Sequence, residues 1–249
     1  MIPSRGMIVR ARSPVFFRRS SKISFMNTPD KIDFERDSNL ERLAEAYYDS
    51  RLHYHNFQHI LNTLAFGNRI LIDCQSEQVT LSKQIVYLAI LFHDAGYSED
   101  HTRLGFDTKE RYSANLAENV LVTENYPPTQ IKAVKEAIVS TERNATFKTA
   151  EQQAVRAADL FGMAASYDIF LLNSVRLKKE HEYLSNSRIS WDTWKHVSVE
   201  VVKDFITHDI PLIGYFKKSD SSSQFSIAVE KNLERFTAES AEPSWANHL

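Results

Sequence analysis

Proline and glycine are so scarce through the middle of this sequence that a helical chain is the simplest outcome. No proline occurs between Pro29 and Pro127 or between Pro128 and Pro211, and the 249 residues include only 6 glycines. These two residue types most often interrupt helices and mark turns. The long stretches that lack them favour long helices and predict an all-α chain.

The apolar residues agree with this prediction, because they recur every three or four positions, as on one face of a helix. The first such segment is 40–47, where Ser38 followed by Glu41 predicts a capping box at the helix start. A second helix is expected over residues 57–72, with its start near Asn56. Further helices are expected within residues 114–121, 131–138, 151–160, 163–174, 194–205 and 225–236.

The segment 81–94 is apolar nearly all round, which predicts a central buried helix that ends at Gly96. Its unbroken apolar run, 85–92, is far shorter than the roughly 20 residues that cross a bilayer, so no membrane partner is expected. No stretch shows convincing two-residue alternation. We therefore predict one all-α helical bundle over residues 30–249, which ends in a loose polar tail at 239–249.

Residues 1–29 form a basic extension that differs from the rest of the chain, because they contain arginine and lysine but no acidic residue. An Arg- and Ser-rich, acid-poor start resembles an organelle transit peptide, and a disordered tail or a true start at Met26 are the alternatives. The formal net charge of −2 argues against polymeric nucleic acid as a partner. We expect a cytoplasmic protein, or a mitochondrial or other organellar one if the extension is a transit peptide.

The histidines are unevenly distributed, and two of the places where they occur suggest metal binding. Three of the nine lie within residues 51–59, and His93 adjoins Asp94 at the end of the most apolar segment. Aspartate is rarely buried without a partner, and the carbonyl end of a helix favours a cation. The pair therefore predicts metal ligands, and the alternative is a capping aspartate beside a structural histidine.

Asp159 is also a candidate metal ligand, because it lies near the end of the predicted helix 151–160. The alternative is that it forms a salt bridge with Arg156. A mixed set of imidazoles and carboxylates, with no thiolate, suits Mn²⁺, Fe²⁺, Co²⁺ or Mg²⁺ better than a structural Zn²⁺. The expected metal ligands are His59, His93, Asp94 and Asp159.

The order of these residues resembles the H…HD…D signature of the HD-domain metal-dependent phosphohydrolase superfamily. The match is closest to its branch of small predicted HD phosphohydrolases, which open with Tyr-His-Asn-x-x-His. The residues that carry the resemblance are Tyr54, His55, Asn56 and His59, then Leu91, Phe92, His93, Asp94 and Tyr97, then Glu110, Ser113 and Ala114, and finally Ala158, Asp159 and Leu160.

This resemblance covers residues 40–236 and implies an HD-type helical bundle that hydrolyses a nucleotide or another small phosphorylated metabolite. The opening is also similar to that of cyclic-nucleotide phosphodiesterases, which implies that His55 is a general acid and His59 a ligand. The segment 140–144 lacks the histidines that binuclear members place there, which implies one metal ion.

The remaining roles are assigned from the chemistry of the side chains. Asp94 or Glu110 is expected to be the base, and Arg51, Asn56 and Tyr97 are assigned to substrate binding. Lys178 and Lys179 are interpreted as surface charges, and a homo-oligomer is compatible with the sequence. A non-catalytic metal- or nucleotide-binding module and an iron-dependent oxygenase stay as alternatives.

Overall fold

The computed structural model describes residues 34–249, and this part of the chain is helical and contains no strand. The all-α prediction is therefore confirmed for the described residues, whereas the basic extension 1–29 lies outside them. The helices are α1 (Ser38–Glu45), α2 (Phe57–Ser76), α3 (Lys83–Phe92), α4 (Lys109–Thr123), α5 (Pro128–Val139), α6 (Ala150–Leu160), α7 (Tyr167–Ser185), α8 (Trp191–Thr207) and α9 (Gln224–Ala238), with 3₁₀ helices η1 (Phe161–Ala164) and η2 (Ser244–His248).

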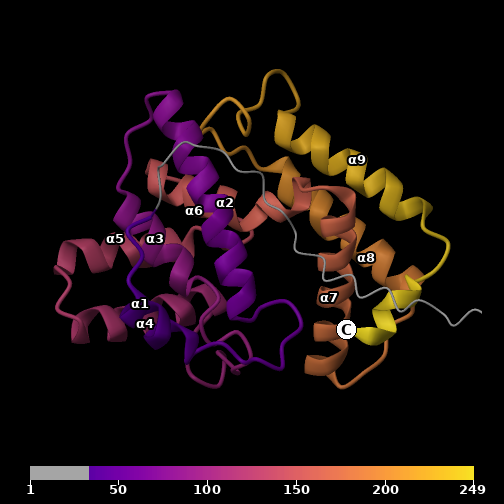
Figure 1. Ribbon diagram of the computed structural model, residues 1–249, viewed down its shortest axis with the longest axis horizontal. Coiled ribbons are helices and arrows are strands. Elements are labelled where there is room, and N and C mark those ends of the chain that lie inside the picture. The colour runs from indigo at the N-terminus through magenta and orange to yellow at the C-terminus, as the bar shows by residue number, and fades with distance from the viewer. Residues whose placement is uncertain (1–33) are drawn as a thin grey trace, which may run out of the picture. The chain divides into compact units, whose positions relative to one another are not determined.

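The described helices form two groups that η1 connects (Figure 1). In the first group α3 packs against α2, α4, α5 and α6, and in the second α9 packs against α7 and α8. Helix α3 lies at the centre of the first group, with every side chain from Val86 to Phe92 buried, as its all-round apolar character predicts. The region that follows α3 is therefore held by packing from several sides.

N-cap side chains fix the first residues of α2 and α1. Asn56 caps α2, as predicted, by accepting hydrogen bonds from the backbone N–H groups of Gln58 and His59. The predicted Ser38 capping box is wrong, because Asp37 is the cap of α1 and Ser38 is already helical. Glu41 instead pairs with an arginine that precedes the helix.

Gly96 allows the sharp turn that follows α3. The helix ends at Phe92, four residues earlier than predicted, and the chain then turns through Gly96 at a φ of +72°. The Gly96 N–H donates to the carbonyl oxygen of Tyr47 at 2.9 Å. A Cβ at this position would lie 2.5 Å from Tyr112 and 2.8 Å from Leu116, so both conformation and space require glycine.

Replacing Gly96 by alanine is expected to lower the free energy of unfolding by about 2–5 kcal/mol, from the left-handed backbone and the crowding together. Gly105→Ala is the matched control, because Gly105 also has a positive φ (+88°) but nothing within 4 Å of an added Cβ. The control should lose only about 1–2 kcal/mol. Urea unfolding measures both values, and equal losses would contradict the crowding argument.

Most residues of the predicted tail 239–249 are exposed, but some of them contact α7, and one lysine predicted at the surface is buried beside the tail. Ala246 is 1% exposed, and Glu239 accepts a hydrogen bond from the hydroxyl of Tyr167 in α7. Lys178 is buried and pairs with Glu182 and, in the tail, with Glu242. These long-range contacts have no signature in the local sequence, which explains why Lys178 was expected at the surface.

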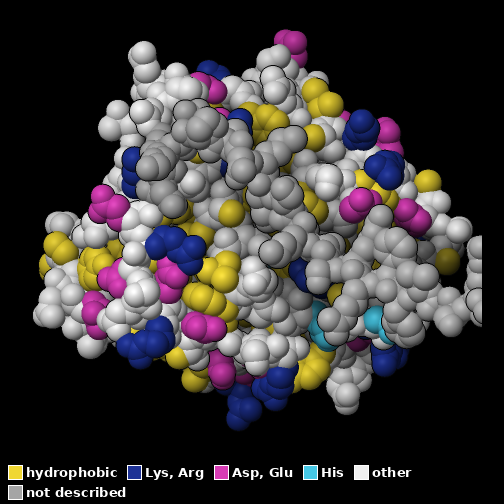
Figure 2. Space-filling view, in the orientation of Figure 1, with side chains coloured by type: hydrophobic (Ala, Val, Ile, Leu, Met, Phe, Trp, Pro, Cys, Tyr) yellow, Lys and Arg dark blue, Asp and Glu magenta, His cyan; other side chains and the backbone are white. Residues whose placement is uncertain are grey.

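Among residues 34–249, no helix combines the length and the apolar character needed to cross a membrane. On the face shown in Figure 2, the described basic and acidic side chains are interspersed, in keeping with a net charge near zero. The compartment of the protein stays a prediction.

Candidate metal centre

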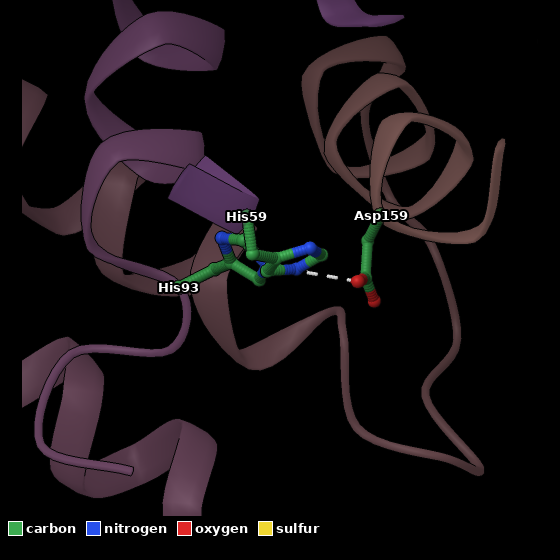
Figure 3. Close-up of side chains that lie close together, drawn as sticks. All are labelled: His59, His93 and Asp159. Carbon is green, nitrogen blue, oxygen red and sulfur yellow. Dashed lines mark ion pairs between the residues drawn. The ribbon is translucent and has the colours of Figure 1, made fainter. Parts of the chain in front are cut away.

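Three helix ends bring His59, His93 and Asp159 together (Figure 3). His59 lies in the first turn of α2, His93 directly follows the last residue of α3, and Asp159 lies in the last turn of α6. One ligand atom from each of the three residues lies within 4.8 Å of the others. Segments about 100 residues apart in sequence thus meet at one point.

The two imidazoles are buried and each has a nitrogen without a hydrogen-bond partner. His59 is 8% exposed and His93 is 1% exposed, and the Nε2 atom of each is buried and makes no hydrogen bond. The His93 Nδ1 lies 2.8 Å from the carbonyl oxygen of Ile90, which can only accept, so Nδ1 carries a hydrogen. In neutral His93 the lone pair is therefore on Nε2, the atom that faces the cluster.

Asp94 completes the group with a carboxylate beside both imidazoles. Its Oδ2 lies 3.1 Å from His93 Nε2 and 3.4 Å from His59 Nε2, and Asp159 Oδ1 lies 3.6 Å from His93 Nε2. These distances fall within ion-pair range, but neither carboxylate makes a hydrogen bond with the buried Nε2 atoms. The structure thus brings all four predicted ligands together.

The electrostatics of this group favour positive charge. Burial opposes protonation of His93, but Asp94 and Asp159 outweigh it and raise the pKa of His93 well above its usual value. Burial would raise the pKa of Asp94, yet His93 and His55 hold it well below its usual value. Burial lowers the pKa of His59, which keeps that imidazole neutral and able to bind a metal.

These residues fit a divalent cation on the evidence of their own chemistry. A metal ion would satisfy both buried imidazole nitrogens, because it would take the place of the proton that the two carboxylates favour on His93, and an unsatisfied buried polar atom is costly. Two nitrogens with carboxylate oxygens form a mixed donor set that leaves coordination positions open for water or substrate. The cluster could therefore hold a divalent metal ion.

A cavity of about 430 Å³ adjoins the cluster. Its volume is in the range of small-molecule sites, about 300–1,000 Å³. The charged, imidazole and phenol side chains that line it come from the first group of helices and the segments next to them, and they are Tyr54, His55, Asp94, Tyr97, Lys109, Glu110, Arg156 and Asp159. The cavity can thus present ligands, a proton donor, a proton acceptor and two cations to one molecule.

His55 is held at the edge of this cavity by Glu180, a residue of α7. The His55 Nδ1 donates to Glu180 Oε1, while Glu180 Oε2 accepts from the backbone N–H groups of Tyr54 and His55, both at 2.8 Å. The His55 ring stacks on Tyr97, with ring centroids 3.7 Å apart. Because Nδ1 is engaged, Nε2 is the atom left to exchange a proton.

Glu180 was not among the predicted site residues. It lies 125 residues beyond His55, in a stretch of alternating basic and acidic residues that looks like a solvated helix face. Burial would raise the pKa of Glu180, but its bonds to His55 lower it, so it stays a carboxylate. No local sequence signal identifies this contact.

Glu110 lies in the first turn of α4 and also lines the cavity. Burial and the negative charge of Asp94 raise the pKa of Glu110. The neighbouring Lys109 places its Nζ 3.6 Å from the centre of the Tyr97 ring. The Tyr97 ring thus contacts both an imidazole and an ammonium group.

Arg156 is a buried cation on the cavity wall, 3% exposed. Its guanidinium donates to the backbone carbonyl oxygens of Thr141 and Arg143. Among residues 34–249 it has no carboxylate within ion-pair distance, and Asp159 pairs with His93 instead, so the salt-bridge alternative for Asp159 is wrong. A buried guanidinium without a paired anion is well suited to binding a phosphate.

No protein-family model, no curated protein and no solved structure matches this chain. Any statement on function therefore depends on the geometry of the site itself.

Two of the residues assigned to substrate binding are not brought to the cavity. The Arg51 side chain is 72% exposed and binds the carboxylate of Asp49 at 2.7 Å. Asn56 uses both ends of its amide locally, since its Nδ2 donates to the carbonyl oxygen of Leu52 while its Oδ1 caps α2. Tyr97 is the one of the three that lines the cavity.

Proposed function

We propose that this chain is a metal-dependent phosphohydrolase of the HD-domain type. A single divalent cation, Mn²⁺, Fe²⁺, Co²⁺ or Mg²⁺, would be held by His59, His93, Asp94 and Asp159. The substrate would be a nucleotide or another small phosphate ester. The observation that carries the proposal is the convergence of two buried, unpartnered imidazole nitrogens with Asp159 at the wall of a substrate-sized cavity.

The cavity wall supplies what a phosphate ester needs. When bound, the cation would polarise a phosphoryl oxygen and lower the pKa of a coordinated water. Arg156 and Lys109 provide positive charge for the remaining phosphate oxygens, and burial makes those charges more effective than they would be in water. Their separate positions on α6 and α4 would orient the phosphate within the cavity.

Two groups have the position and chemistry for proton transfer. Asp94 lies against both imidazoles and is therefore best used as a ligand, which leaves Glu110 as the base that accepts a proton from the attacking water. The raised pKa of Glu110 brings it closer to neutral pH, where a general base is most effective. His55 Nε2 would protonate the leaving oxygen, with Glu180 holding the ring in place.

The direct test is phosphate release by purified protein supplied with each of the four cations. A panel of nucleotides, sugar phosphates and nitrophenyl phosphate covers the substrate class. We expect release that needs the cation and stops when a chelator removes it. Absence of release from every ester, with the metal bound, would favour the non-catalytic module, and metal-dependent oxygen uptake would favour the oxygenase.

Glu110→Gln is expected to lower kcat by about 10²–10⁴-fold while the metal content stays unchanged, because it removes a base and not a ligand. The loss should be similar for nitrophenyl and alkyl phosphates, since the base acts on water. Glu118→Gln on the same helix is the control, because Glu118 pairs with Lys135 and does not line the cavity. A Glu110→Gln protein with full activity would remove the base assignment.

A further inference from the structure

Helix α8 carries an apolar stripe that packs only partly against the core and otherwise lines the cavity. Only Trp191 and Ile206 of its 17 residues are buried. The periodicity predicts that Trp194, Val197 and Val201 face a core, yet all three line the cavity and stay partly or largely exposed. An apolar stripe on a cavity wall loses contacts that a ligand can restore.

The cavity thus has two chemically different halves. The half formed by α7, η1 and α8 contains no charged side chain, and its apolar lining includes Met163, Phe170, Leu177, Trp194, Val201 and Phe205. The other half holds two of the expected metal ligands, Asp94 and Asp159, together with Arg156 and Lys109. A molecule that fills both halves must be anionic at one end and largely apolar at the other.

The apolar half also has an unsatisfied polar atom. Ser198 Oγ lines the cavity, is buried and has no hydrogen-bond partner in the described structure. Ser174 accepts a hydrogen bond from the Trp194 indole at 3.0 Å, which leaves its hydroxyl hydrogen available. These two hydroxyls and the Asn173 amide are the polar side-chain groups of this half, and they could bind a polar atom of a bound molecule, whereas the rest of the lining is apolar.

We propose that the phosphate esters bound here carry an uncharged, largely apolar organic group that lies against α8, an inference that rests on the proposed function. The phosphate group occupies the charged half, beside Arg156 and Lys109. The organic group occupies the half lined by Trp194 and Val201. Small sugar phosphates lack the apolar surface that this half is built to cover.

The test compares ethyl phosphate with hexyl phosphate, which have the same charge and the same kind of leaving group. Each added methylene that leaves water strengthens binding by up to about fourfold, so hexyl phosphate should bind on the order of 10²-fold more tightly. Calorimetric titration into Mn²⁺-supplemented Glu110→Gln protein measures this without turnover. Equal affinities, or no measurable binding of either ester, would overturn the inference.

Val201→Asn places an amide on the apolar wall and should weaken hexyl phosphate binding about 10-fold while leaving ethyl phosphate unchanged. Val201 is half-buried, so the change should not prevent folding. Val122→Asn is the matched control, because Val122 lies on α4, is 59% exposed and does not line this cavity. If Val201→Asn binds hexyl phosphate as tightly as the control does, the inference is also overturned.

Turnover separates this inference from the proposed function. Hydrolysis of nitrophenyl phosphate with no preference for hexyl over ethyl phosphate would overturn the apolar-group inference and leave the phosphohydrolase proposal intact. Tighter binding of hexyl phosphate without hydrolysis of any ester would support the apolar half while contradicting the proposed activity.

Discussion

Asp159→Ala is expected to deplete the bound metal ion and to abolish phosphate release. Asp159 supplies one of the three ligand atoms that lie within 4.8 Å of one another, and alanine has no atom to replace its oxygen. Loss of groups that only orient metal ligands weakens metal binding by 10–100-fold, so loss of a ligand should weaken it by at least about 10²-fold. Metal analysis of the purified variant measures this directly.

Thermal unfolding provides an independent measure of the same effect. A cation at 100 times its dissociation constant stabilises the folded protein by about 2.7 kcal/mol, or roughly 5–10 °C for a domain of this size. Asp159→Ala should show almost none of this shift when Mn²⁺ is added. Asp73→Ala is the control, because Asp73 is a partly exposed aspartate on α2 that pairs with Arg69. Stoichiometric metal in Asp159→Ala would show that Asp159 is not a ligand.

His55→Ala should retain the metal and the fold but lose about 10²–10⁴-fold in kcat on alkyl phosphates, the usual contribution of one acid–base group. The loss should be smaller for nitrophenyl phosphate, whose leaving group needs less protonation. Rates for the two ester types, with metal content measured alongside, test this expectation. An equal loss on both would exclude the acid role and leave His55 as a residue that positions the substrate.

Glu180→Gln tests how His55 is held. The amide cannot supply the negative charge that stabilises a protonated imidazole, so kcat on alkyl phosphates should fall about 10-fold or more with KM little changed. Glu182→Gln is the control on the same helix, because Glu182 binds Lys178 and Arg188 instead. The control should lose stability rather than turnover, and the opposite pattern would contradict the positioning role of Glu180.

Local sequence patterns were enough to predict the helices and to select the four candidate metal ligands. A helix repeats every 3.6 residues, so apolar periodicity and the absence of proline identify it without knowledge of its neighbours. His93 and Asp94 were selected because they directly follow the most apolar segment, where a buried polar side chain needs a hydrogen-bonding or charged partner. Such patterns do not fix the exact start of a helix, because adjacent polar residues can each act as the N-cap. In α1 the N-cap is Asp37 and not Ser38.

Only the tertiary structure decided which side chains surround the predicted ligands. Glu180 reaches His55 across 125 residues of sequence, Arg156 binds backbone carbonyls rather than Asp159, and Arg51 binds its neighbour Asp49. The α8 stripe lines a cavity as well as packing against the core, although its spacing is that of any amphipathic helix. The physical reason is that periodicity specifies which residues share a helix face, whereas the partner of that face depends on how distant helices pack.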